Sequence, residues 1–353
     1  MSMSSTSSLK VALVMPTYFD DGSVLAGGER YAHELATALS RKTPTTLFTF
    51  SKKKSVGKVG PLTVRRCGVL FYAGGIVNPV SFSHIPDLMN FDVIHCLQPR
   101  TWVTDLAFIS GFLSHKKTFL TDLGGGALYT PGRFLPLHRL IHGFLPISEF
   151  NRGLNLKIQK PVTILYGGVD THLFSPSSEI QKSRDLILHV GRIFPLKGLH
   201  LLIEALPPQA RLEVVGQCHD SAYRDKLKSL CIGKRVKFLG ALSDAQLVQK
   251  YREAFITVLP SLVDTGFTSS MESMACGTPV LGTRLGSLPE VVKEDVSGFL
   301  VEPNSVGALR KKIEELLAEP MRVEKLAPGC REEVLSRFTW EYVANRCLEA
   351  YQA

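Results

Sequence analysis

The sequence lacks an apolar run of the roughly 18 to 20 residues that a helix needs to cross a bilayer. Residues 1–8 are polar and rich in serine, without the apolar core of a signal peptide, so we expect them to be a disordered end. The seven cysteines are an odd number without a C-x-x-C pair, which argues against a disulfide framework and against a zinc ribbon. Such cysteines are typical of a reducing compartment. We expect a cytoplasmic protein, either free or peripheral at the inner face of the membrane.

Metal ligands and nucleic-acid motifs are also missing. The ten histidines are scattered and form no convincing metal cluster, so we expect no bound metal. The motifs of nucleic-acid-binding proteins are absent, so we expect no nucleic-acid partner. If the formal net charge of +9 has a functional role, it therefore points to an acidic partner of another kind.

The positive charge is concentrated in the first half of the chain. Residues 1–172 hold 18 lysines and arginines against 10 acids, whereas the remainder holds 23 against 22. This excess predicts an acidic partner for the first half, such as a phosphorylated or lipid-linked acceptor or an anionic membrane surface. The alternative interpretation is that the charge only keeps the protein in solution.

The 353 residues are enough for two domains of ordinary size, and the pattern of the sequence starts twice. Strand candidates alternate with helical patterns in each half, which indicates parallel α/β units with helices on both faces. We expect an α/β fold with two doubly wound, Rossmann-like domains, residues 1–172 and 183–335, joined by a linker at 173–182 and facing each other across a cleft. The amphipathic residues 336–353 predict a helix that packs back on the first domain.

The strand candidates are short apolar runs. In the first domain they are Leu9–Met15, Thr45–Phe50, Leu62–Cys67, Asp92–Cys96, Lys117–Thr121, Phe144–Ile147 and Val162–Leu165. In the second domain they are Leu186–Val190, Arg211–Val215, Val236–Leu239, Ile256–Leu259, Val280–Gly282 and Gly298–Val301. A helix is expected after the opening strand of each domain, near Gly28–Ala36 and over Gly198–Ala205.

The segment Pro260–Val280 places two acids, Asp264 and Glu272, eight positions apart. The apolar run before it predicts a buried parallel strand, and Thr268 or Ser269 is in position to cap the helix that follows. A helix that starts at the carboxyl end of a parallel strand is an anion site, because its first N–H groups point at the ligand. The segment therefore predicts a phosphate site flanked by carboxylates that suit the hydroxyl groups of a sugar or ribose.

A loop with glycine follows the opening strand of each domain. In the second domain, Gly191 lets the backbone approach a ligand, while Arg192 and Lys197 can both reach a pyrophosphate. In the first domain, Gly27 and Gly28 at a helix start fit close approach to a phosphate or a sugar. The alternatives are a solvated loop with two surface cations and an ordinary loop with a helix cap.

Together these motifs resemble the retaining nucleotide-sugar glycosyltransferases of glycosyltransferase family 4, which have the GT-B fold. The resemblance covers most of the chain and is strongest from 186 to 305. The segments that match the family's motifs in order are Gly27–Arg30, Pro146–Arg152, Tyr166–Asp170, Val190–Gly198, Glu272–Pro279, Gly286–Glu290 and Gly298–Val301. The ordered set is highly specific, although no single segment is decisive.

The resemblance implies a metal-independent enzyme that moves a sugar from a nucleoside diphosphate sugar to an acceptor with retention of the anomeric configuration. Arg192 and Lys197 would hold the donor diphosphate and stabilise its leaving charge. Asp264 would contact the transferring sugar, and Glu272 would accept hydrogen bonds from the nucleotide ribose. The remaining donor-binding residues implied by the family pattern are Gly27, Gly28, Gly191, Gly240, Ala241, Leu242, Gly266, Phe267, Thr268 and Ser269.

Three positions depart from the family pattern. Asp264 stands where the family usually has a glutamate, and Gly266 and Phe267 reverse the usual order of that pair. The loop after a central strand of the first domain, which carries a histidine in many members, has Asp122 instead. Asp122 would contact the sugar or the acceptor in its place; the alternative is an ordinary turn aspartate.

Two further features of the first domain have two interpretations each, and a third has one. Gly132–Phe144 interleaves basic and apolar residues, which predicts contact with a membrane surface; the alternative is a helix that packs on its own sheet. His95 ends an apolar strand and either faces the cleft or is structural. Lys52–Lys54 is a solvated loop that adds to the basic half.

Two other functions stay open at this point. GT-B sugar phosphorylases, synthases and nucleotide-sugar epimerases share the fold, and a fold alone does not separate them from transferases. The second is a catalytically weak subunit that binds a sugar nucleotide or glycan, which the substituted acid at Asp264 and the reversed Gly266-Phe267 pair would suit. The sequence leaves the donor sugar, the base and the acceptor undetermined.

Overall fold

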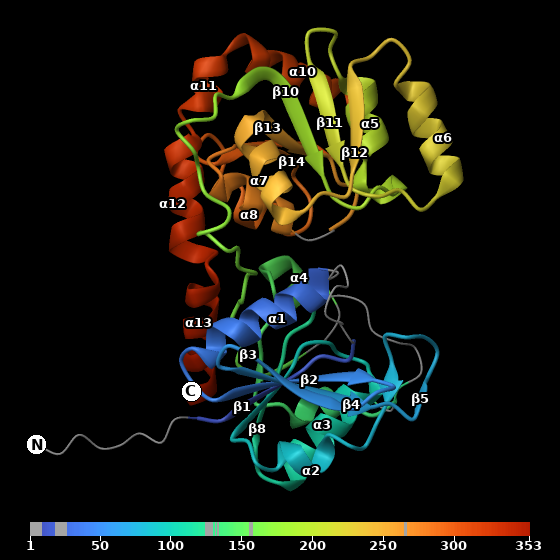
Figure 1. Ribbon diagram of the computed structural model, residues 1–353, viewed down its shortest axis with the longest axis vertical. Coiled ribbons are helices and arrows are strands. Elements are labelled where there is room, and N and C mark those ends of the chain that lie inside the picture. Colours follow the sequence, from blue (N-terminus) through green and yellow to red (C-terminus); the bar gives the residue numbers. More distant parts are fainter. Residues whose placement is uncertain are drawn as a thin grey trace, which may run out of the picture. The chain divides into compact units, whose positions relative to one another are not determined.

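The computed structural model divides the chain into two compact units (Figure 1). Unit 1 comprises Met1–Gly168 and Trp340–Ala353, and unit 2 comprises Val169–Thr339. The residues that the structure describes are 9–17, 27–123, 130, 132, 134–154, 158–264 and 267–353.

The division between the units lies at Gly168, earlier than the linker expected at 173–182. Val169 forms a parallel bridge with Thr339, and its N–H donates to the carbonyl of Phe338 at 2.8 Å. These bonds tie the first residue of unit 2 to its last residues, so the following chain already belongs to unit 2. Arg331 strengthens the tie, because its guanidinium donates to the carbonyls of Thr171 and Phe174.

Unit 1 contains, within its described residues, a seven-stranded sheet in the order β3-β4-β2-β1-β7-β8-β9. Its strands pair in parallel except for β3, which is antiparallel to β4. The strands of the unit are β1 Val11–Val14, β2 Thr45–Ser51, β3 Ser55–Val59, β4 Leu62–Gly68, β5 Phe71–Tyr72, β6 Pro79–Val80, β7 Val93–Cys96, β8 Lys117–Leu120 and β9 Gly143–Phe144. Its helical elements are α1 Gly27–Ser40, α2 Ile85–Leu88, α3 Trp102–Leu113, η2 Leu137–Leu140, α4 Glu149–Leu154 and α13 Trp340–Gln352.

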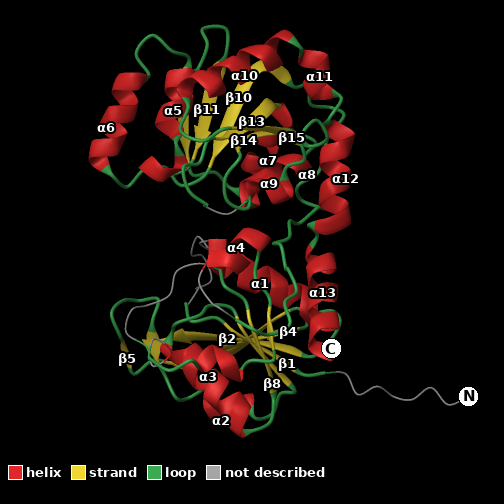
Figure 2. Ribbon diagram, turned by 180° about the vertical axis from the view of Figure 1, so that it is seen from behind, coloured by secondary structure: helices red, strands yellow, loops and turns green. Residues whose placement is uncertain are grey.

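The two faces of this sheet carry separate apolar cores. One core joins the sheet to α1 and α13, and the Tyr31 and Trp340 rings meet edge to face within it, 5.2 Å between centroids. The other core joins the opposite face to α2, α3 and η2 (Figure 2). The C-terminal helix thus packs on unit 1, as the amphipathic pattern of 336–353 predicted.

Unit 2 repeats the doubly wound plan. Its described residues form a six-stranded, all-parallel sheet in the order β12-β11-β10-β13-β14-β15. The strands are β10 Ser183–Val190, β11 Arg211–Val215, β12 Val236–Gly240, β13 Ala254–Leu259, β14 Val280–Thr283 and β15 Gly298–Val301. The helical elements are η3 Pro195–Lys197, α5 Leu199–Ala205, α6 Ser221–Leu230, α7 Asp244–Glu253, α8 Thr268–Ala275, α9 Leu288–Val291, α10 Val306–Ala318, α11 Pro320–Glu324 and α12 Ala327–Arg337. The predicted α/β class with two doubly wound domains is confirmed.

Two sequence expectations differ from the structure outside the regular sheets. The candidate strand Val162–Leu165 is reduced to a single bridge between Val162 and Phe144, because β9 has only two residues to pair with. Among its described residues, the segment Gly132–Phe144 has no longer helix than the short 3-10 helix η2, which Pro136 precedes, and it ends in the two-residue strand β9. Its apolar side chains Leu137, Ile141 and Phe144 lie in the core of unit 1.

Candidate functional site

The loop after β10 is fixed by the strand next to it in the sheet. Gly198 has φ of 70°, and a Cβ there would lie 2.0 Å from the carbonyl oxygen of Pro260, so no other residue fits without a shift. The N–H of Leu262 donates to the carbonyl of Leu196 at 2.8 Å, which pins the loop a second time. Lys197 is therefore held in a defined place at the carboxyl end of the sheet.

Three neighbouring strands end in glycines with positive φ: Gly191 after β10, Gly216 after β11 and Gly240 at the end of β12. The N–H of Gly216 donates to the carbonyl of Gly240 at 2.8 Å, and a Cβ on Gly216 would lie 1.9 Å from the carbonyl oxygen of Gly191. Gly216 is not among the residues predicted from the sequence, although the run Val214-Val215-Gly216 repeats the pattern of a strand followed by glycine that marked Gly191. Because these three residues have no side chains, their backbones can lie close together, and no side chain at these three positions covers the strand ends.

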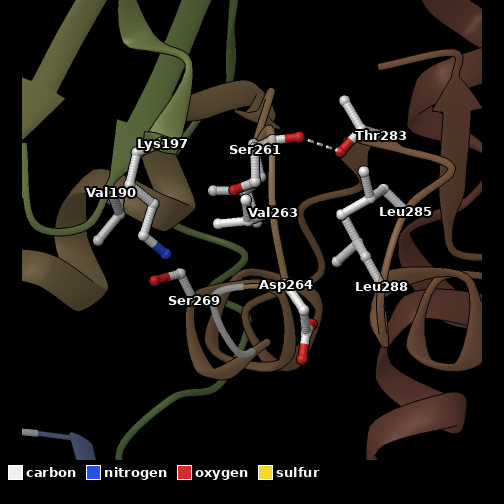
Figure 3. Close-up of a pocket in the computed structure, with 10 residues that line it drawn as sticks. Val190, Lys197, Ser261, Val263, Asp264, Ser269, Thr283, Leu285 and Leu288 are labelled. Carbon is white, nitrogen blue, oxygen red and sulfur yellow. Dashed lines mark hydrogen bonds between the residues drawn. The ribbon is translucent and has the colours of Figure 1, made fainter. Parts of the chain in front are cut away.

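A small pocket lies at this carboxyl end, between the ends of β10, β13 and β14 and the start of α8 (Figure 3). Figure 3 shows the ammonium of Lys197 turned toward the hydroxyl of Ser269 and the carboxylate of Asp264 on another wall. The pocket is lined by Val190, Lys197, Leu259, Ser261, Val263, Asp264, Ser269, Thr283, Leu285 and Leu288. Gly240, exposed Ala241 and half-buried Leu242 are not among these lining residues, because β12 is the edge strand, two positions from β10.

Lys197 is an ammonium in a partly desolvated place. Burial, and after it the charge of Arg192, lowers its pKa to about 8, although the carboxylate of Asp264 acts in the opposite direction. Arg192 itself is exposed and lies over the ring of Phe194, 5.4 Å from its centroid. Arg192 and Lys197 together concentrate positive charge at this place. An anionic ligand bound there would offset the cost of desolvating the Lys197 ammonium.

The helix α8 begins without a side-chain cap. Its N-cap is Phe267, which is buried, and no side-chain hydrogen bond closes the first turn, so the expectation that Thr268 or Ser269 caps the helix is wrong. The carbonyl of Phe267 accepts from the N–H groups of Ser270 and Met271 instead. The N–H groups of Thr268 and Ser269 precede the first intrahelical bond, and Ser269 lines the pocket, so the start of α8 has the N–H groups that an anion can accept from. Gly266 lies outside the described residues.

Glu272 lies one turn into α8 and is only 5% exposed. The hydroxyl of Tyr251, from α7, donates to its Oε2 at 3.0 Å. Burial and then the charge of Glu272 raise the pKa of Tyr251 well above its ordinary value, so the phenol keeps its proton and remains a donor. Tyr251 therefore fixes the orientation of the carboxylate, a role that no motif in the sequence predicts.

Asp264 is held by the loop that follows β14. Its Oδ1 accepts from the N–H of Ser287 at 3.0 Å and from the Ser287 hydroxyl at 2.6 Å. Gly286 has φ of 64°, and a Cβ there would lie 2.6 Å from Oδ1, so the backbone passes directly against the carboxylate. The loop after β14 thus anchors Asp264, and Ser287 positions its carboxylate.

We expect Ser287→Ala to lower kcat of the sugar transfer that the family resemblance implies about tenfold, with little change in the KM of the implied donor, because one of the two hydrogen bonds to Asp264 is lost. The N–H of residue 287 still donates to Asp264, so the loss stays partial. Steady-state kinetics would measure it. The matched control is Thr283→Val, which removes another hydrogen bond beside the pocket, from Thr283 to the carbonyl of Ser261. Equal losses in both variants would contradict the positioning role.

Three candidate residues, Gly27, Gly28 and Asp122, lie in unit 1. Gly27 and Gly28 begin α1, and a Cβ on Gly28 would make only an ordinary contact, 3.5 Å from the methyl of Met15. Asp122 follows β8 and is 2% exposed. His95, in contrast, is structural.

His95 connects the C-terminal helix to the sheet of unit 1. Its Nδ1 lies 2.7 Å from the hydroxyl of Tyr351, and its Nε2 lies 2.8 Å from Oγ1 of Thr121. Thr121 donates its own proton to the carbonyl of Leu145, so His95 donates from Nε2 and accepts at Nδ1. Burial lowers the pKa of His95 to about 3, which keeps the ring neutral in this role.

The described residues contain no group of three or more histidines, cysteines and acids that could hold a metal ion. Within the same part of the chain, no helix is long and apolar enough to cross a membrane. Neither finding bears on the segments outside the described residues.

Comparison with known proteins shows which proteins the chain is similar to. Residues 170–332 match the family model of the glycosyl transferases group 1. An uncharacterized glycosyltransferase of Methanocaldococcus jannaschii is 25% identical over 306 residues, 74% of this chain and 75% of that protein. The D-inositol 3-phosphate glycosyltransferase of Mycolicibacterium smegmatis is 31% identical over 207 residues, 54% of this chain and 47% of that protein. The chain thus spans about half the length of that relative.

Solved structures agree on the fold. The sucrose-phosphate synthase of Thermosynechococcus elongatus superimposes with a TM-score of 0.75 at 20% identity, covering 97% of this chain and 98% of that one. HepE of Anabaena, crystallised with UDP, superimposes with a TM-score of 0.74 at 18% identity, covering 98% and 100%. Residues 170–332 thus match a glycosyl transferases group 1 domain, and the chain has the GT-B fold that these structures share, as the ordered motifs predicted.

Proposed function

We propose that the protein transfers a sugar from a nucleoside diphosphate sugar to an acceptor, with retention of the anomeric configuration and without a bound metal. The observation that carries this proposal is the juxtaposition of the Lys197 ammonium with the uncapped start of α8 at the carboxyl end of the unit 2 sheet. A fixed cation and the first N–H groups of a helix are the groups that bind a diphosphate. HepE, with a similar fold, was crystallised with UDP and with UDP-glucose.

In the proposed reaction, the protein supplies position and charge rather than a strong nucleophile. Lys197, Arg192 and the N–H groups of Thr268 and Ser269 stabilise the negative charge that develops on the departing diphosphate. The departing phosphate then helps to take the proton of the acceptor hydroxyl, while the sugar passes through a state that resembles an oxocarbenium ion.

The two acids of the site bind hydroxyl groups of the donor. Asp264, oriented by Ser287, contacts the transferring sugar, whose partial positive charge at the reacting carbon a carboxylate favours. Glu272, oriented by Tyr251, accepts from the ribose. Gly191 and Gly240, and the exposed backbone after them, bring the carboxyl edge of the sheet close to the nucleotide.

The proposed acceptor binds unit 1 and is acidic or lipid-linked. This part of the proposal rests on the charge of residues 1–172, which hold 18 lysines and arginines against 10 acids. Gly27, Gly28 and buried Asp122 lie at the helix start and the strand end that would face such a ligand in unit 1.

A screen of thermal unfolding tests the donor class. Nucleoside diphosphates and their sugars bind only the folded state and raise the midpoint, whereas the monophosphates lack the second phosphate that Lys197 would hold. Product analysis by NMR with the donor so identified then reports the anomeric configuration, and a reaction in EDTA tests the absence of a metal. Phosphorolysis or epimerisation without transfer would assign one of the alternative GT-B activities, and binding without turnover would assign a partner subunit.

We expect kcat/KM for the donor to be flat below pH 8 and to fall above about pH 8. The pKa of Lys197 is lowered to about 8, so the free enzyme loses this positive charge as the pH rises through that value. A bound diphosphate favours the charged form, so kcat should fall at a higher pH than kcat/KM. In Lys197→Arg the fall should disappear, because a guanidinium stays charged, even if the rate itself is lower. An unchanged fall in that variant would assign the titration to another group.

A further inference from the structure

A buried histidine adjoins the pocket at the carboxyl end of the unit 2 sheet. His189 is the last residue but one of β10, and it is 1% exposed. The next residue, Val190, lines the pocket. The Nδ1 of His189 lies 2.9 Å from the carbonyl oxygen of Val258 on β13, and the residue after Val258, Leu259, also lines the pocket. The imidazole therefore lies between the ends of two strands whose next residues form the pocket.

The bond to Val258 determines the tautomer of the ring. A carbonyl oxygen only accepts, so Nδ1 of His189 carries the proton, and Nε2 of the neutral ring is an acceptor. Burial lowers the pKa of His189 to about 4, which keeps the ring neutral near pH 7. Within the described part of the chain, the buried Nε2 has no hydrogen-bond partner. Buried polar atoms are nearly always paired, so this lone pair indicates a donor that reaches it in the working protein.

The donor nearest in kind is the ammonium of Lys197. After burial, the positive charge of Lys197 also lowers the pKa of His189, so the ammonium acts on the ring. The ammonium also lies close to the end of β10, because a Cβ on Gly191 would be 4.0 Å from Nζ of Lys197. A ligand in the pocket does not reach a ring that is buried, whereas Lys197 both lines the pocket and acts on His189. An ammonium has three N–H donors, enough for Nε2 and for a ligand at once.

A hydroxyl oxygen of α8 faces the same ammonium. Figure 3 shows Lys197 turned toward Ser269. Burial raises the pKa of Tyr251, and a hydrogen bond from the Ser269 hydroxyl acts against this rise, so the Ser269 proton goes to Tyr251 and its oxygen keeps lone pairs for a donor. The charged groups that act on the Lys197 ammonium are Arg192 of its own loop and Asp264 after β13, while α8 and β14 contribute neutral hydroxyls to the pocket.

We propose that His189 is a positioning residue for Lys197: its Nε2 accepts a hydrogen bond from the ammonium and keeps it charged and in place for the diphosphate. An acceptor below the ammonium favours the charged form and offsets part of the cost of its desolvation. His189 does not touch the donor and acts only through Lys197. The consequence for donor binding rests on the proposed function, whereas the bond from Lys197 to His189 needs no donor.

The titration of Lys197 in the full chain without ligand tests the bond. NMR of lysine labelled at Cε follows the charge of each ammonium, and the signal lost in Lys197→Arg is that of Lys197. Its midpoint should lie near the pKa of about 8 in the wild type. In His189→Asn it should lie about one pH unit lower, the shift expected when one hydrogen bond to a charged group is lost. The shorter amide can still donate to Val258 from about the place of Nδ1, but it does not reach the ammonium.

Two further variants separate this role from packing. His189→Gln carries an amide oxygen to about the place of Nε2 and gives up the bond to Val258, so it should keep the wild-type titration of Lys197 and lower the thermal midpoint. His189→Asn should do the reverse. The matched control is His84→Asn, because His84 is fully buried in unit 1 and its Nδ1 likewise has no partner among the described residues. This control should leave the titration of Lys197 unchanged.

The bond can also be detected from the histidine side with His189 intact. In protein with nitrogen-labelled histidine, the Nε2 signal of His189 should shift in Lys197→Met, because the acceptor loses its donor, and the signals of His84 should not. An unshifted Nε2 signal, or equal midpoints of Lys197 in the wild type and His189→Asn, would overturn the inference.

Calorimetric titration with the nucleoside diphosphate that binds the wild type then measures the consequence for the donor. In His189→Asn the affinity should fall about fivefold at pH 8 and stay nearly unchanged at pH 6, because a midpoint one unit lower reduces the charged fraction of Lys197 only near its own pKa. A shifted midpoint of Lys197 without nucleotide affinity at either pH would support the bond and contradict the proposed function.

Discussion

Lys197→Ala is expected to lower kcat of sugar transfer by about 10²–10³-fold, the loss typical of removing one group that stabilises developing negative charge. Gly198 and the bond from Leu262 to Leu196 hold this ammonium beside the start of α8. Arg192 does not replace it, because its exposed guanidinium is screened by solvent. The measurement is steady-state transfer with the donor found in the nucleotide screen.

The same variant should fold normally. The pKa of Lys197 is lowered mainly by burial, so the folded state bears a cost for this charge, and its removal should leave the thermal midpoint unchanged or slightly raised. Lys250→Ala is the matched control, since Lys250 pairs with Glu213 and Glu253 at 3.1 and 2.8 Å and is not among the residues that line the pocket. Comparable losses of activity in both variants would contradict the role of Lys197.

Glu272→Gln is expected to weaken donor binding by about 10- to 100-fold with a small effect on stability. An amide keeps an oxygen for the Tyr251 hydroxyl but gives up the charge that strengthens a hydrogen bond from the ribose. Glu272→Ala should lose as much affinity and also about 1–3 kcal/mol of folding free energy, because the buried hydroxyl of Tyr251 loses this acceptor. Calorimetric titration and thermal unfolding measure the two effects separately.

Tyr251→Phe separates orientation from contact. It removes the hydroxyl that orients Glu272 and leaves the carboxylate in place, so donor affinity should fall less than in Glu272→Gln. If Glu272→Gln bound the donor as tightly as the wild type while only its stability changed, Glu272 would be a structural acid of α8 and not a ligand of the ribose.

The regular part of the fold could be predicted because both sheets are almost wholly parallel and buried. Several of their strands are therefore apolar runs, such as Gly298–Val301, whose predicted bounds match β15. The predicted bounds of Arg211–Val215 also match β11, although Arg211 and Glu213 interrupt its apolar residues. The loop at Gly191 and the helix after Pro260 could be predicted for a related reason. Glycines and polar residues that follow directly on an apolar strand stand out in the sequence, and at the carboxyl end of a parallel strand they indicate a ligand site.

What escaped prediction depends on contacts between segments distant in the sequence. The edge strand β3 alternates weakly and contains Lys58, and β5 and β6 have two residues each, so none of the three has a strong periodic signal. Ser287 and Tyr251 act through hydrogen bonds to acids 23 and 21 positions away. Phe267 became the N-cap of α8 through its backbone, because the chain turns there without needing a side-chain oxygen.

The central claim is that a nucleoside diphosphate binds at Lys197 and the start of α8. Isothermal titration calorimetry of the full chain in EDTA tests it most directly, with the diphosphates of uridine, adenosine, guanosine and thymidine as ligands. We predict one site per chain for one of these nucleotides, with an affinity that falls at least tenfold in Lys197→Ala and stays unchanged in Lys250→Ala. Absence of binding by every diphosphate, or equal affinity of the wild type and Lys197→Ala, would contradict the account.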